Sequence, residues 1–167
     1  MRNNPKRLVV HFGTAKGRQI RANYLSLTFT KIVNDKAVLV PVIDGLNSES
    51  DSVTFEDPNG LLFSTQFAQP AISLMSTAEM AALKARCLVQ QDAMFAGHSL
   101  GEYSALLSCA GFTTLENLLS LTFYRGLVMQ NQMSRDANGR TDFSMVAVNP
   151  SRVREGRLSP VTHATNG

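Results

Sequence analysis

The residues best suited to chemistry in this sequence are Gly97-His98-Ser99-Leu100-Gly101. A Gly-x-Ser-x-Gly pattern between a buried strand and a helix is typical of a sharp turn that exposes a serine hydroxyl. Glycines on either side of the serine let the strand, the helix and the substrate approach without Cβ collisions. We therefore predict that Ser99 is a nucleophile and that the backbone N–H of Leu100 donates to the oxyanion.

His98 directly precedes the predicted nucleophile and is a candidate general base. Adjacent residues at such a turn point in different directions, so His98 is interpreted as a structural or pocket-lining residue.

The elements that must position Ser99 are predicted from hydrophobic periodicity. Ala93–Ala96 is a short apolar run of the kind that fills a buried parallel strand, and Phe143–Val148 is a second such run. Glu102–Cys109 and about Leu115–Gln130 carry helical patterns. Alternating strands and helices predict an α/β fold with a mostly parallel sheet.

The segment before the motif is predicted in less detail. Pro70 suits a first helical turn, and apolar or small residues follow it at helical spacing as far as Leu88. Leu8–Phe12 reads as a short strand, and residues 16–29 are weakly helical. Residues 31–55 hold short β-branched runs and polar turns, and are interpreted as a peripheral insertion.

Composition restricts the classes of function. Of the 167 residues 44% are hydrophobic and 17% are charged, as in ordinary globular domains, and the net charge of +3 is scattered rather than gathered into a basic stripe. Nucleic-acid binding is therefore not expected. Cys87 and Cys109 lack metal-site spacing and are predicted to be reduced core thiols, so no metal is expected. No signal peptide or membrane span is evident, which predicts a cytoplasmic protein.

The wider sequence resembles a known family. Gly97–Leu106, which contains Gly-His-Ser-Leu-Gly-Glu, is similar to the nucleophile segment of malonyl-type acyl-carrier-protein transacylases. Gly60–Ala71, Phe123–Gln130 and Val146–Val153 resemble successive stretches of the malonyl/palmitoyl transferase of fungal fatty acid synthase beta subunits. The similarity extends from about Asn4 to Val153.

This resemblance implies a partial acyltransferase domain, α/β-hydrolase-like with a nucleophile elbow, over residues 1–153. Residues 1–57 would be a fungal-type N-terminal insertion, 58–153 the core, and 154–167 a divergent, disordered tail.

The resemblance also assigns roles to side chains. Ser99 would carry the acyl group, Arg125 would bind the malonyl carboxylate, and Gln69 and His98 would line the substrate site. A planar guanidinium suits a carboxylate because it can form two parallel hydrogen bonds. From the residues alone, Arg125 fits a solvated helix arginine and Gln69 fits a cap of the helix predicted to begin at Pro70.

The implied substrates are thioesters of coenzyme A and of phosphopantetheine, with malonyl or palmitoyl as the acyl group and no tightly bound cofactor. The implied partners are the acyl carrier protein and other synthase segments. The family's activating histidine comes later in the chain, and His11, His98 and His163 do not match it. We therefore expect a truncated chain with little activity by itself.

Two alternatives stay open. A serine thioesterase or hydrolase would share the Ser99 motif but would have no use for Arg125. A non-catalytic remnant or assembly piece of a fatty acid synthase would contribute surface and no chemistry.

Overall fold

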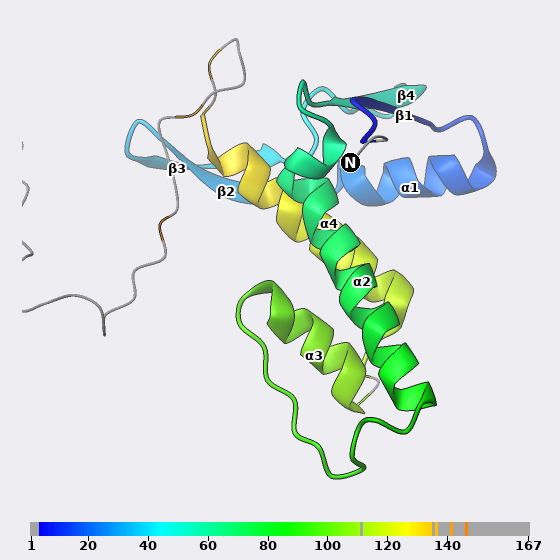
Figure 1. Cartoon of the computed structure of the whole chain (residues 1–167). Coiled ribbons are helices and arrows are strands. Elements are labelled where there is room, and N and C mark those ends of the chain that lie inside the picture. The colour runs from blue at the N-terminus through cyan, green and yellow to red at the C-terminus, as the bar shows by residue number, and fades with distance from the viewer. Residues whose placement is uncertain (1–3, 111, 135, 137–140, 142–145, 147–167) are drawn as a thin grey trace, which may run out of the picture. The chain divides into compact units, whose positions relative to one another are not determined.

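The computed structural model describes residues 4–110, 112–134, 136, 141 and 146 (Figure 1). The chain divides into two units, Met1–Ser134 and Arg135–Gly167, and all the helices and strands described below belong to the first. Except for Val146, the predicted strand Phe143–Val148 lies outside the described residues, as does the predicted tail 154–167.

The strands form two small sheets. β1 (Arg7–His11) pairs antiparallel with β4 (Ser52–Glu56), and β2 (Thr28–Val33) pairs antiparallel with β3 (Lys36–Pro41). The β2–β3 hairpin turns at Asn34 and Asp35, whose φ angles are 50° and 59°. Two-residue hairpin turns of the primed type require positive φ, and Asn and Asp tolerate it better than most residues.

Four α-helices and one 3₁₀ turn are described. They are α1 (Ala15–Leu25), η1 (Leu61–Phe63), α2 (Thr65–Ala85), α3 (Leu100–Ala110) and α4 (Leu115–Gln132). Thr14 and Thr114 cap α1 and α4 by accepting hydrogen bonds from backbone N–H groups. The helices predicted at Glu102–Cys109 and Leu115–Gln130 are confirmed within two residues at each end.

The mixture of helices and strands agrees with the predicted α/β class, but both described sheets are antiparallel. Ala93–Ala96, the predicted parallel strand, has no ladder partner within the described residues. An apolar run shows that a segment is suited to burial, whereas a parallel strand also needs a partner delivered by a crossover connection. The predicted parallel sheet is therefore not found in this part of the chain.

The predicted helix start at Pro70 is wrong. Helix α2 begins at Thr65 with Ser64 as its N-cap residue, so Pro70 lies inside the helix. A proline there lacks the N–H that would bond the carbonyl of Gln66, which costs stability. The first turns of α2 pack against α4, and this tertiary contact offsets the local cost.

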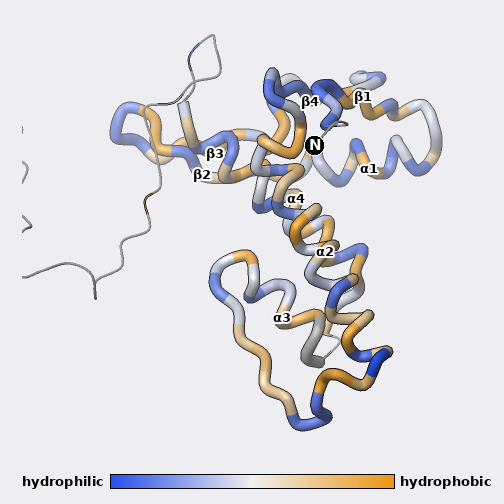
Figure 2. The backbone as a smooth tube through the Cα atoms, in the orientation of Figure 1, coloured by the Kyte–Doolittle hydropathy of each residue, from blue (hydrophilic) through white to orange (hydrophobic). Residues whose placement is uncertain are grey.

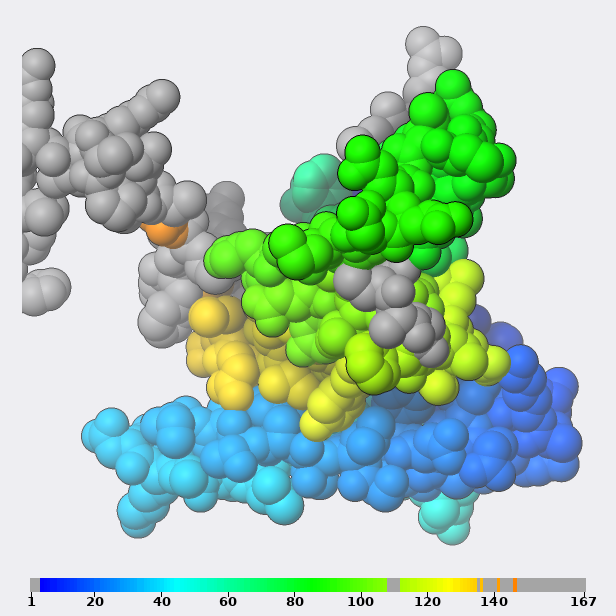
Figure 3. Space-filling view, turned by 90° about the horizontal axis from the view of Figure 1, so that it is seen from below, coloured from blue at the N-terminus to red at the C-terminus, as the bar shows by residue number. Residues whose placement is uncertain are grey.

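The core lies between the N-terminal strands and α4. Phe29, Val42, Ile43 and Leu127 form its buried centre. Phe55, Phe67 and Phe123 extend it with edge-to-face ring contacts. Figure 3 shows the N-terminal residues as a continuous band against which α4 lies. Residues 31–55, interpreted as peripheral, therefore contribute directly to the described core.

No helix among the described residues combines the length and apolarity needed to cross a membrane. Figure 2 shows apolar and polar stretches alternating along the described backbone, α2 included. Cys87 is a free thiol, as predicted, but its side chain is exposed rather than in the core.

Candidate active site

Ser99 lies on a strained turn. Its φ is 53°, a left-handed conformation that costs a non-glycine residue on the order of 1–2 kcal/mol. An extended segment, residues 93–97, leads into this turn, and α3 begins at the next residue, Leu100. The N–H of Gly101 donates to the carbonyl of His98 at 2.9 Å and closes the turn. Ser99 therefore stands at the N-terminus of a helix, where backbone N–H groups lack intrahelical partners.

Gly97 is required by the close approach of the extended segment to α3. A Cβ atom at this position would overlap the backbone carbonyl group of Gly101 and the backbone nitrogen of Glu102. At Gly101, by contrast, a Cβ atom would meet nothing within 4 Å. Of the two glycines in the motif, only the first is fixed by contacts within the described residues.

Glu102 holds the turn from the helix side. Its Oε1 accepts a hydrogen bond from the backbone N–H of Ser99 at 3.2 Å. This is one half of a capping box, the arrangement in which residue N3 binds the N-cap N–H and the N-cap side chain binds the N3 N–H. The other half is missing, because the Ser99 hydroxyl contacts Arg125 instead.

Arg125 joins α4 to the Ser99 turn. Its Nη2 donates to Ser99 Oγ at 2.9 Å, and its Nη1 donates to Gln69 Oε1 at 2.6 Å. The guanidinium carbon lies 5.5 Å from the ring centroid of Tyr103, within the range of a cation–π contact. Three side chains from α2, α3 and the turn therefore hold one half-buried guanidinium.

Gln69 is buried, with 6% of its surface exposed, and both ends of its amide are used. Its oxygen accepts from Arg125, and its Nε2 donates to the thioether sulfur of Met129 at 3.2 Å. The interpretation of Gln69 as a helix cap is wrong, because α2 begins at Thr65.

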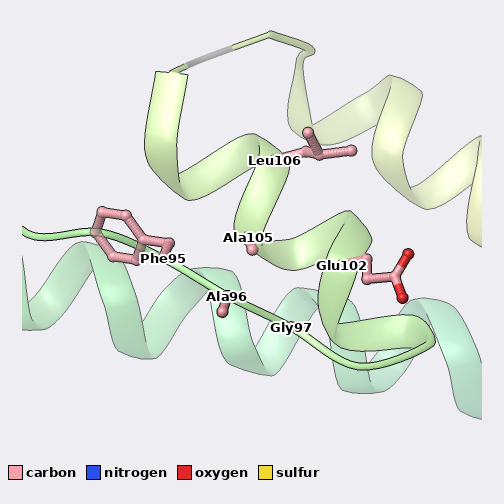
Figure 4. A pocket seen from close by; sticks show the side chains of 6 residues that line it. All are labelled: Phe95, Ala96, Gly97, Glu102, Ala105 and Leu106. Atoms are coloured by element: carbon pink, nitrogen blue, oxygen red, sulfur yellow. The ribbon is translucent and has the colours of Figure 1, made fainter.

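An apolar hollow of about 290 Å³ lies between the extended segment and α3 (Figure 4). It is lined by Phe95, Ala96, Gly97, Glu102, Ala105 and Leu106. The α3 residues of this lining follow i, i+3, i+4 spacing and share one face of the helix. Tyr103, which contacts Arg125, falls on a neighbouring face.

Two charged side chains lie at Ser99: Arg125 contacts its hydroxyl, and Glu102 contacts its backbone N–H. No carboxylate within the described residues forms an ion pair with Arg125. The N-terminus of α3 adds a partial positive charge beside Ser99. The Arg125 guanidinium therefore places a positive charge directly at the serine hydroxyl, which suits an anionic group there, while the Glu102 carboxylate offsets part of the helix-terminus charge on the backbone side of the turn.

The described histidines do not contact the serine hydroxyl. His98 is exposed beside Ser99, and His11 is exposed at the end of β1. Neither side chain forms a hydrogen bond to Ser99 Oγ, and His163 lies outside the described residues. No His, Cys, Asp and Glu cluster suited to a metal ion occurs in the described part of the chain.

The structure thus brings Ser99, Arg125 and Gln69 together, with the N–H of Leu100 at the adjoining helix start. Sequence reasoning missed Glu102, Tyr103 and Met129 as members of this cluster. Two signals were available: Ser-x-x-Glu at 99 and 102 has capping-box spacing, and Arg125 and Met129 have the i, i+4 spacing of neighbours on one helix face.

Known proteins are similar in sequence to this chain. The acyl transferase domain family matches residues 18–165. The chain is 53% identical over 153 residues to the fatty acid synthase beta subunit hexB of Dothistroma septosporum and 52% identical over 154 residues to the fatty acid synthase subunit beta of Aspergillus oryzae. The fatty acid synthase subunit beta of Saccharomyces cerevisiae is 46% identical over 151 residues. These alignments cover 90–92% of the chain but only 7–8% of each relative's length.

Proposed function

Because the chain belongs to the acyl transferase domain family, we propose that it supplies the nucleophile and the acyl-binding groups for acyl transfer in fatty acid synthesis. The acyl group would pass from coenzyme A to Ser99 and then to the phosphopantetheine thiol of an acyl carrier protein. The observation that supports this proposal best is the contact of the Arg125 guanidinium with Ser99 Oγ.

In the proposed reaction, the turn at Ser99 acts as a nucleophile elbow. Ser99 Oγ attacks the thioester carbonyl carbon, and the hydroxyl proton passes to a base. The N–H of Leu100 donates to the carbonyl oxygen as it becomes negative, with the α3 N-terminus adding positive potential. The C–S bond then breaks, and coenzyme A leaves as its thiol after the sulfur takes the proton from the base. The carrier-protein thiol attacks the serine ester by the same sequence, which frees Ser99.

The charge of Arg125 supports a carboxylate-bearing acyl group such as malonyl. A guanidinium has five donors in a planar fork. Two of the Arg125 nitrogens each bind an uncharged oxygen, so donors remain for a carboxylate that approaches Ser99. A thioesterase acting on uncharged acyl chains would gain nothing from this cation. For palmitoyl transfer the support is the family resemblance described above.

The proposed activity needs a base that the described residues do not place at Ser99. Without one the hydroxyl is a weak nucleophile. We therefore propose that the chain by itself is acylated slowly.

The test measures covalent labelling of Ser99 by malonyl-coenzyme A and by acetyl-coenzyme A, using intact mass and peptide mapping. We expect slow labelling that Ser99→Ala abolishes and faster labelling by malonyl than by acetyl. Arg125→Ala should lower the malonyl rate about 10- to 100-fold, as expected for losing a hydrogen bond to a charged group, and should leave the acetyl rate nearly unchanged.

Added acyl carrier protein should collect the label from the wild-type chain. Release of free malonate in place of that transfer would support the hydrolase alternative. A chain that stays unlabelled after prolonged incubation with either thioester would support the non-catalytic alternative.

A further inference from the structure

Three successive hydrogen bonds connect Met129 of α4 with Ser99 through Gln69 of α2 and Arg125. The Met129 sulfur accepts from Gln69 Nε2, Gln69 Oε1 accepts from Arg125 Nη1, and Arg125 Nη2 donates to Ser99 Oγ. Arg125 and Met129 lie four residues apart on α4, so they occupy adjacent turns of one helix face. The side-chain amide of Gln69, on α2, forms a hydrogen bond with each of them.

The amide of Gln69 needs both partners. It is buried, and a buried polar group without a partner carries a desolvation penalty. Within the described residues the only acceptor for Nε2 is the sulfur of Met129. If that acceptor is removed, the buried Nε2 loses its hydrogen bond, and rotation of the amide toward another partner lowers the free energy. Such a rotation withdraws Oε1 from the guanidinium or presents N–H groups to it.

We propose that Met129 is a positioning residue: its thioether fixes the amide of Gln69, and this amide orients the Arg125 guanidinium toward Ser99 and an acyl carboxylate. The inference rests on the proposed function, because it assigns the Arg125 guanidinium to a substrate carboxylate. Met129 itself touches no reacting atom, since 36% of its surface is exposed and its described polar contact is with Gln69.

A purely packing role for Met129 makes a different prediction. Leucine has nearly the volume of methionine and no acceptor, so Met129→Leu preserves packing and removes the hydrogen bond. Glutamine has a similar length and restores an acceptor oxygen, so Met129→Gln is the matched rescue variant. Because the side chain is partly exposed, both substitutions should be tolerated by the fold.

The experiment measures the dissociation constants of malonyl-coenzyme A and acetyl-coenzyme A by equilibrium dialysis against the 167-residue chain. Binding needs no base, so it can be read even where turnover is slow. The readout is the ratio of the two constants, which a general loss of stability does not change. Arg125→Ala serves as the reference for complete loss of selectivity, and thermal unfolding reports the fold of each variant.

We expect Met129→Leu to lower the preference for malonyl about three- to tenfold, the range of one uncharged hydrogen bond, and Met129→Gln to retain most of it. If Met129→Leu keeps the full preference, or if Leu and Gln lower it equally, the inference is overturned while the proposed function stands. If the wild-type chain and Arg125→Ala bind both thioesters alike, the carboxylate role of Arg125 fails, and the inference fails with it.

Discussion

At position 99 two demands compete for one hydroxyl. A serine at a helix start normally turns its hydroxyl back to cap a backbone N–H of the first turn, which stabilises the helix. Here the left-handed backbone of Ser99 directs Oγ to Arg125, and only the Glu102 half of the capping box remains. The strained backbone at Ser99 costs conformational free energy. The Glu102 carboxylate offsets part of this cost, because it accepts a hydrogen bond from the Ser99 N–H in the strained geometry.

This predicts distinct results for two substitutions of Glu102. Glu102→Ala removes the acceptor, so Ser99 should relax to an ordinary N-cap conformation with its hydroxyl bound to the helix. We expect the rate of Ser99 labelling by malonyl-coenzyme A to fall about fivefold, which corresponds to about 1 kcal/mol.

Glu102→Gln is the matched control, because its side-chain oxygen can still accept from the Ser99 N–H. Labelling kinetics of both variants against the wild-type chain check the prediction. Equal rates for Glu102→Ala and the wild type would show that the turn holds its geometry without this contact.

The geometry of the site depends on how closely α2 and α4 cross. The crossing point is Gly126, where a Cβ atom would lie 2.5 Å from Gln66 Cα and 2.7 Å from the carbonyl oxygen of Thr65. Gln69 is almost one turn further along α2, and Arg125 is the residue before the crossing glycine. The close approach therefore brings the amide and the guanidinium within 2.6 Å.

Gly126→Ala should push the two helices apart. Overpacking of this kind costs about 1–3 kcal/mol, and the higher helix propensity of alanine returns up to about 1 kcal/mol. We expect a net loss of unfolding free energy of about 1–2 kcal/mol together with weaker malonyl selectivity. Urea unfolding followed by circular dichroism measures the first, and the dialysis ratio measures the second.

Gly101→Ala is the control for the same chemical change in a helix, because a Cβ there meets no neighbour within 4 Å. It should be neutral or slightly stabilising. If Gly126→Ala changes the unfolding free energy and the malonyl selectivity no more than Gly101→Ala does, the helix crossing can accommodate a Cβ atom and does not set the Gln69–Arg125 distance.

The sequence predicts the helices and strands whose bounds are set by neighbouring residues, and it does not predict those set by contacts between distant segments. Helices α3 and α4 followed from side-chain periodicity. The start of α2 did not, because packing against α4 outweighs the local preference for proline in a first turn. The pairing of β1 with β4 joins segments far apart in sequence, and no local pattern specifies such a partner. The contact between Ser99 and Arg125 was suggested only by family resemblance, since nothing in the spacing of a serine and a helix arginine requires them to meet.

The first unit is held together around the middle and the C-terminal end of α4. Asn131 Nδ2 donates to the carbonyl of Val42 at 2.7 Å, and Lys31 Nζ donates to the carbonyl of Asn131 at 2.7 Å. Phe123 packs its ring edge-to-face with Tyr24 of α1 at a centroid distance of 5.9 Å. The N-terminal strands and α1 therefore fix the helix that carries Arg125, although none of them touches Ser99.

Tyr24 makes this packing sensitive to alkaline pH. Burial raises the pKa of the Tyr24 hydroxyl above its ordinary value of 10.0, because the ionised form is poorly solvated beside the core. The folded chain therefore holds the proton more tightly than the unfolded chain does. The stability linked to this group is present in full below pH 10.0 and is lost progressively as the pH rises above that value toward and through the folded pKa.

Urea unfolding between pH 8 and pH 11 checks this, with Tyr24→Phe as the matched variant that keeps the ring contact with Phe123 and cannot ionise. We expect the wild type to lose more unfolding free energy than Tyr24→Phe above about pH 10 and the same amount below it. Parallel stability curves for the two proteins up to pH 11 would mean that the hydroxyl is as well solvated in the folded chain as in the unfolded one.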